Sequence, residues 1–146
     1  MNVVVIYDST YGNTAEVARA IGSSISGETR VLRVGEVNPG ELNTFDLLIF
    51  GSPTQGGRPT KIMQDFIENI PESVLKGKQT AVFDTRLSSK LVGVFGYAAG
   101  RMADSLRKKG VPVLFAEGFF VKGKEGGLKE GELARAAGWA KEINKK

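Results

Sequence analysis

The chain has 146 residues, and its 41% hydrophobic and 25% charged content is ordinary for a globular domain. It contains no cysteine and no histidine, which excludes disulfides, thiolate nucleophiles and the usual zinc and triad chemistry. The net charge is +4, but neither of the two basic runs, 107–109 and 145–146, is interleaved with aromatics, so we expect solvated cations and no nucleic-acid site. Residues 1–21 lack a basic n-region, and no apolar run approaches the roughly 20 residues that span a bilayer. We therefore expect a cytoplasmic protein with no membrane segment.

The first half of the chain alternates strand patterns with helix patterns. Residues 3–7 form a continuous apolar run, which is typical of a strand buried on both faces of a parallel sheet. Apolar residues at helical spacing follow over 13–25, and residues 29–34 mix polar and apolar side chains as an edge strand does. Residues 46–50 are predicted as a third strand and 60–70 as a second helix. That helix is expected to bury one face, formed by Ile62, Phe66, Ile67 and Ile70.

The second half continues the alternation. Residues 80–83 are a short apolar strand, residues 96–109 form a helix that ends at Gly110, and a fifth strand starts at residues 113–115. The segment 122–131 is rich in Gly, Lys and Glu and is predicted as an exposed loop. The last helix carries an apolar stripe of Leu133, Ala136, Ala137, Ala140 and Ile143.

Strand–helix alternation predicts one α/β domain over residues 1–146, a doubly wound five-stranded parallel sheet with helices on both faces. Ligands of such sheets bind at the carboxyl ends of the strands, beside the topological switch point. The residues directly after the first, third and fourth strands are therefore the candidates for a binding site.

The loop after the first strand has the composition of a phosphate cradle. Its candidate binding residues are Ser9, Thr10, Tyr11, Gly12, Asn13 and Thr14. A helix starts there, so unpaired N–H groups and a partial positive charge combine with hydroxyl donors, and no cation is needed. The alternative is a capping box of Asn13 and Glu16, which requires no ligand. The loop is neither a Walker loop nor a Gly-x-Gly-x-x-Gly turn.

This loop resembles the FMN phosphate loop of the flavodoxins, whose usual pattern is Ser/Thr-x-Thr-Gly-Asn-Thr. Tyr11 stands where a third hydroxyl residue commonly sits, and the Tyr-Gly-Asn-Thr variant is similar to flavodoxin modules of larger flavoproteins. The resemblance extends over nearly the whole chain. It implies the short-chain flavodoxin-like fold, with strand order 2-1-3-4-5, and FMN as the cofactor.

The other two loops are similar to the segments that flank the flavin ring in that family. After the third strand the cofactor-binding candidates are Pro53, Thr54, Gln55, Gly56 and Gly57. The glycine pair lets a peptide take either orientation, and the resemblance implies that a carbonyl there can turn toward the reduced ring. After the fourth strand the candidates are Asp84, Thr85 and Arg86. Arg86 either places positive charge near the ring, which favours the anionic reduced flavin, or forms a surface salt bridge.

Three features depart from the family pattern. Gln55 occupies the place where a tryptophan is often found, and the stretch 87–95 offers no tyrosine near the expected position. It offers Leu91, Val92 and Val94 instead, while Phe95 and Tyr97 are expected to lie too far into the following helix. Fewer ring contacts predict weaker binding or a more exposed ring. The basic net charge also differs from the acidic charge typical of carrier flavodoxins.

The resemblance implies an electron-transfer protein that carries single electrons on FMN between redox partners, a reductase and an acceptor. Such a carrier needs no catalytic side chain and no metal, so the lack of His and Cys is no handicap. One alternative is an NAD(P)H-dependent flavin or quinone reductase, although those oxidoreductases tend to be longer. The other alternative is a flavin-free interaction module on the same fold. A redox carrier is favoured over a self-contained enzyme.

Overall fold

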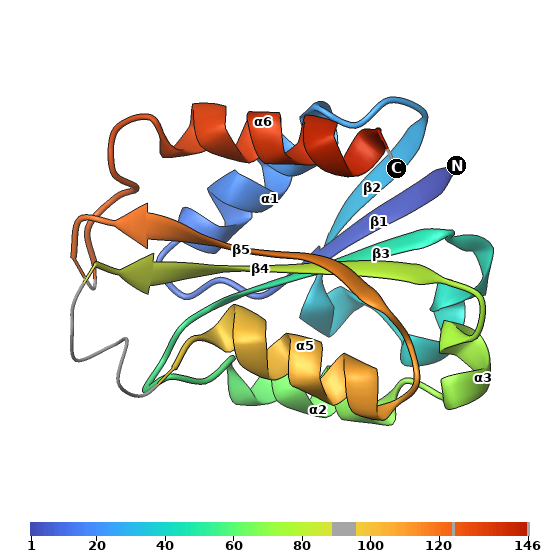
Figure 1. The fold of residues 1–146 in the computed structure, drawn as a ribbon. Coiled ribbons are helices and arrows are strands. Elements are labelled where there is room, and N and C mark those ends of the chain that lie inside the picture. The colour runs from blue at the N-terminus through green and yellow to red at the C-terminus, as the bar shows by residue number, and fades with distance from the viewer. Residues whose placement is uncertain (89–95, 124, 146) are drawn as a thin grey trace.

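The computed structural model describes residues 1–88, 96–123 and 125–145, and its centre is a five-stranded parallel sheet (Figure 1). The strands are β1 (Asn2–Tyr7), β2 (Glu28–Arg33), β3 (Leu47–Pro53), β4 (Gln79–Leu87) and β5 (Val113–Val121). Every neighbouring pair is parallel, and the order is β2-β1-β3-β4-β5. The predicted fold class, strand order and edge position of the second strand are confirmed.

Helices cover both faces of the sheet. Helices α1 (Asn13–Ser23) and α6 (Glu132–Asn144) lie on one face, and α2 (Lys61–Asn69), α3 (Glu72–Leu75) and α5 (Ala98–Lys108) lie on the other (Figure 1). Two 3-10 turns, η1 (Val34–Glu36) and η2 (Pro39–Thr44), connect β2 to β3. In the part of the chain that the structure describes, no helix has both the length and the apolarity needed to cross a membrane.

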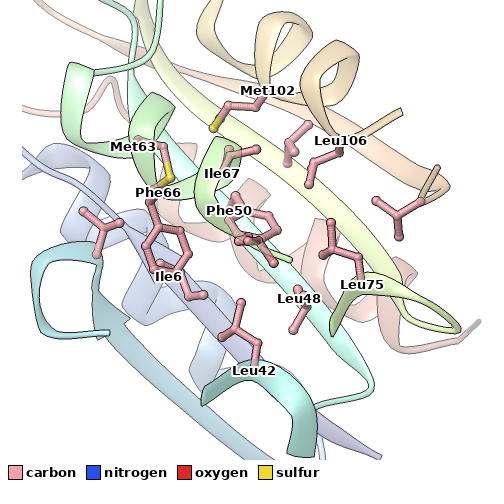
Figure 2. Close-up of a cluster of buried hydrophobic side chains, with 14 of the residues drawn as sticks. Ile6, Leu42, Leu48, Phe50, Met63, Phe66, Ile67, Leu75, Met102 and Leu106 are labelled. Atoms are coloured by element: carbon pink, nitrogen blue, oxygen red, sulfur yellow. The ribbon is translucent and has the colours of Figure 1, made fainter. Parts of the chain in front are cut away.

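The core consists of two apolar layers, one on each face of the sheet. Successive residues of β1 alternate between them: Val4 and Ile6 face the layer under α2 and α5, whereas Val3 and Val5 face the layer under α1. Strand β3 alternates in the same way, and Figure 2 shows Leu48 and Phe50 packed among the side chains of the first layer. Because both faces are buried, the central strands read as continuous apolar runs.

The predicted faces of two helices were wrong at their first turns. Ile62 is 58% exposed and Leu133 is 43% exposed. Helix α2 starts at Lys61, behind the Thr60 cap, and its buried stripe begins at Met63, one position later than predicted. In α6 the buried residue of the first turn is the charged Glu132. The correct phase therefore depends on packing partners that periodicity does not reveal.

Glu132 is buried because its carboxylate has partners on two elements. It accepts hydrogen bonds from the backbone N–H of Phe120 at 2.7 Å and from Arg135 at 2.9 and 2.8 Å. The Arg135 bond and, after it, the Phe120 bond lower the pKa of Glu132 below its ordinary value of 4.5, against the opposing effect of burial. The charged carboxylate thereby fastens α6 to the edge strand β5.

We predict that this contact makes stability sensitive to acid. A lowered pKa in the folded state means that the stabilisation is complete above the unfolded-state value, declines below it, and is lost as the pH falls through the folded-state value. Glu132→Gln keeps an acceptor for Phe120 but loses the charge, so it should destabilise by about 1 kcal/mol at pH 7, since Arg135 is partly exposed. Urea unfolding at pH 7 and pH 3.5 checks this: the difference in free energy of unfolding between the two proteins should be smaller at pH 3.5 than at pH 7. An equal difference in free energy of unfolding at pH 7 and pH 3.5 contradicts the role given to the Glu132 charge.

Candidate functional site

The three predicted loops meet around one cavity at the carboxyl ends of the strands. Its volume is about 590 Å³, within the roughly 300–1,000 Å³ of small-molecule sites. It is lined by Ser9, Thr10, Tyr11, Asn13, Thr14, Pro53, Thr54, Gln55, Gly56, Gly57, Thr85, Arg86, Leu87 and Val121. Twelve of these fourteen residues were candidates in the sequence. Leu87 and Val121 were missed, because both belong to strands that extend farther than their apolar runs indicate.

The first loop is folded around the start of α1. Gly12 is the N-cap residue, with a φ of 96°. The hydroxyl of Ser9 accepts hydrogen bonds from the backbone N–H groups of Gly12 at 3.1 Å and Ala15 at 3.3 Å. Gly12 itself does not line the cavity. Ser9 therefore shapes the helix N-terminus, and its own O–H is left to donate to a ligand.

The alternative of a capping box at Asn13 is wrong. Asn13 is the first helical residue, and its side-chain amide donates to the carbonyl of Gly126 at 2.6 Å. This bond links the first loop to the segment after β5, 113 residues away along the chain. Asn13 thus fastens a fourth loop to the rim of the cavity.

Asp8 fixes the first loop from behind. Its carboxylate accepts hydrogen bonds from the backbone N–H of Ser9 at 2.9 Å, the hydroxyl of Thr60 at 2.6 Å and the guanidinium of Arg33 at 3.3 Å. Arg33 also donates to the carbonyl of Ser9 at 3.2 Å. The network joins β1, β2 and the start of α2 beneath the loop. No local pattern in the sequence indicates this network, because Asp8, Arg33 and Thr60 are far apart in the chain.

Among the described residues, hydrogen bonds between side chains join the three predicted segments. The hydroxyls of Thr14 and Thr85 lie 2.8 Å apart, and both residues are buried, with exposures of 1% and 4%. At the rim, the amide of Gln55 donates to the hydroxyl of Thr10 at 2.9 Å. These bonds connect the walls of the cavity to one another.

The second loop is a tight turn. Gln55 and Arg58 exchange backbone hydrogen bonds at 2.8 and 3.1 Å, and Gly56 and Gly57 between them have φ values of 58° and 78°. Positive φ at both central positions is the reason for the glycine pair. The carbonyl of Gly57 accepts a hydrogen bond from Arg101 of α5 at 2.8 Å. The turn is thereby attached to the helix that follows β4.

The third segment belongs to a strand and not to a loop. Strand β4 extends to Leu87, so Asp84, Thr85 and Arg86 are strand residues with alternating side chains. Arg86 lines the cavity, whereas Asp84 is fully buried beneath it and makes no part of its wall. Leu91, Val92, Val94 and Phe95, which were considered for ring contacts, lie outside the described residues.

Asp84 and Arg86 form a bidentate ion pair. Nε of Arg86 donates to Oδ1 of Asp84 at 2.7 Å, and Nη2 donates to Oδ2 at 2.8 Å. The backbone N–H of Ala99 donates to the same carboxylate at 2.9 Å. Burial raises the pKa of Asp84 above its ordinary value of 3.8, although the bonds from Arg86 and Ala99 act in the opposite direction. Of the two roles considered for Arg86, a surface salt bridge is wrong because its partner is completely buried.

Comparison with known proteins assigns the family. Residues 5–139 match the model of the flavodoxin family. The chain belongs to the flavodoxin family. It is 29% identical over 87 residues to a flavodoxin from Maridesulfovibrio salexigens, covering 55% of this chain and 60% of that protein. It is 33% identical over 70 residues to a flavodoxin from Nitratidesulfovibrio vulgaris, covering 45% and 47%. The matched stretches thus span about half of these curated relatives.

A solved flavodoxin from the domain Archaea shows the same fold. It superposes with a TM-score of 0.80 over 99% of this chain and 97% of that one, at 23% identity. Flavodoxins bind FMN as their cofactor and transfer electrons with it. The cavity fits such a ligand, because a helix N-terminus and free hydroxyl donors suit a phosphate, and the space beside them suits a ring system.

We predict that the buried Thr14–Thr85 bond stabilises the protein before any ligand binds. Thr85→Val leaves the hydroxyl of Thr14 buried without its partner, which should cost about 1–3 kcal/mol. The double variant Thr14→Val/Thr85→Val removes both hydroxyls. Its loss in free energy of unfolding should be smaller than the sum of the losses of the two single variants. Urea unfolding of the four ligand-free proteins measures the coupling. Simple additivity contradicts the prediction.

Proposed function

We propose that this protein holds FMN in the described cavity and carries electrons, one at a time, between a reductase and an acceptor protein in the cytoplasm. The phosphate is assigned to residues 9–14. The flavin ring is assigned to the part of the cavity formed by residues 53–57, Thr85 and Arg86. FMN, when bound, supplies the redox chemistry, and the protein supplies binding and electrostatics.

The start of α1 is the observation that carries this proposal. It presents backbone N–H groups and the hydroxyls of Ser9 and Thr10, and residues 9–14 include no lysine or arginine. Both hydroxyls act as acceptors within the protein, toward Gly12 and Ala15 and toward Gln55, so each keeps its hydrogen for a phosphate oxygen. A site of this kind binds a terminal phosphate through neutral donors and the helix dipole.

The lining of the cavity supports a carrier more than a reductase. Among the described residues that line it, Arg86 is the only charged side chain. The described part of the lining therefore offers no carboxylate, thiol or imidazole that could serve as a general acid or base. A protein whose cofactor exchanges electrons directly with its partners requires none, whereas the NAD(P)H-dependent alternative also requires a place for a second nucleotide.

FMN titration of the purified protein tests the function. We expect a one-to-one complex with changed flavin fluorescence, which dithionite reduces through two separate one-electron steps seen by absorbance. NADPH alone should not reduce the complex at a catalytic rate. Rapid reduction by NADPH identifies the reductase alternative. An intact fold that does not bind micromolar FMN identifies the flavin-free module and overturns the proposal.

The phosphate assignment makes a separate prediction for Thr10. Thr10→Ala removes one donor to a charged group, which is worth about 1.5–3 kcal/mol, so FMN affinity should fall at least tenfold. Riboflavin, which has no phosphate, should bind the variant and the parent equally. Thr10→Ser is the matched control, because it keeps the hydroxyl that accepts the bond from Gln55 and can donate to the phosphate. Equal losses of riboflavin and FMN affinity would falsify the phosphate assignment.

A further inference from the structure

The guanidinium of Arg86 is held in one position on three sides. Asp84 binds one edge of it through Nε and Nη2. The ring of Tyr97 lies 3.5 Å from the guanidinium carbon. Gly118 of β5 packs so closely that a Cβ there would lie 2.2 Å from this carbon. Tyr97, which was expected to lie too far into the helix to matter, precedes α5 and contacts the site through Arg86.

This arrangement directs the positive end of the ion pair toward the cavity. Asp84 is fully buried and does not line the cavity, whereas Arg86 does. The side-on pairing uses Nε and Nη2, so Nη1 lies on the edge away from Asp84, and it makes no hydrogen bond among the described residues. A ligand in the cavity is therefore closer to the guanidinium of Arg86 than to the carboxylate of Asp84.

Arg86 lies on the other face of the sheet from the phosphate loop. The side chain of Thr85 points to Thr14 at the start of α1, and side chains along a strand alternate between faces. Asp84, two residues from Arg86, accordingly accepts a bond from Ala99 of α5, and α1 and α5 cover opposite faces (Figure 1). This placement associates Arg86 with the ring part of the ligand and not with its phosphate.

We propose that Arg86, fixed by Asp84, Tyr97 and Gly118, is the residue that sets the potential of the bound flavin by favouring its reduced form. The inference rests on the proposed function, because it requires FMN in the cavity. Two-electron reduction adds two electrons and one proton to the flavin ring, so the ring changes from neutral to an anion with one negative charge. A fixed cation facing the ring stabilises the anion more than the neutral form, which raises the potential.

Replacing both charges of the pair tests the proposal without changing the net charge. Asp84→Asn/Arg86→Gln keeps the shapes and the possibility of a hydrogen bond between the side chains. We expect its preference for reduced over oxidised FMN to fall about tenfold, equivalent to a drop of about 30 mV in the two-electron potential. The potential is measured by dithionite titration of each FMN complex against a reference dye.

Single variants keep the test decisive if the double variant does not fold. Arg86→Gln should lower the potential at least as much, since Asp84 then either stays anionic or takes up a proton, as its burial favours. Arg86→Lys retains the cation and should restore most of the parent potential. The matched control is Asp104→Asn/Arg107→Gln, which neutralises an exposed pair on α5 that does not line the cavity, and its potential should equal the parent value.

Three outcomes overturn the inference. The first is an unchanged potential in both the double variant and Arg86→Gln, and the second is an equal shift of the potential in the control variant. The third is a loss of FMN affinity in Arg86→Gln with unchanged riboflavin affinity, which would place Arg86 at the phosphate. Failure of the parent protein to bind FMN is a different result, because it removes the proposed function itself. Normal FMN binding with unchanged potentials removes the role of Arg86 alone.

Discussion

The site depends on the divergence of the chain after β1 and β3. These strands are neighbours, but the chain leaves β1 toward α1 on one face and leaves β3 toward α2 on the other (Figure 1). A crevice at this point is a geometric consequence of the strand order. Asp8 occupies its base and bonds to Ser9 on one side and Thr60 on the other. One partly buried carboxylate thus bonds to both of the chain segments that border the cavity.

Hydrogen bonds between the segments hold the walls of the cavity together. Thr14 and Thr85 join the first and third segments, and Thr10 and Gln55 join the first and second. A loop that is already ordered loses less conformational entropy on binding, so more of the contact energy appears as affinity. The same bonds leave donors free, since a hydroxyl that accepts a hydrogen bond still carries its own hydrogen. Rigidity and ligand binding are therefore compatible at these positions.

The sequence was sufficient for the fold and for the location of the site. Apolar runs marked strands buried on both faces, and the loops after them carried recognisable donor residues. It was insufficient wherever a contact joins distant residues. Nothing local indicates that Asn13 bonds to Gly126 or that Arg86 lies against Tyr97. Periodicity also placed Ile62 on the wrong face, because the phase of a short helix is fixed by its cap and its packing partners.

The walls of the cavity show how this chain differs from the pattern that its loops resemble. Among the described residues, Tyr11 is the aromatic side chain that lines the cavity, and it is 49% exposed. Gln55 forms a hydrogen bond across the rim where an aromatic residue would stack on a ring. Tyr97 supports the guanidinium of Arg86, so its ring face is already in use. From the described lining we expect flavin recognition to depend more on the phosphate and on charge than on stacking, so a ligand without the phosphate should bind more weakly.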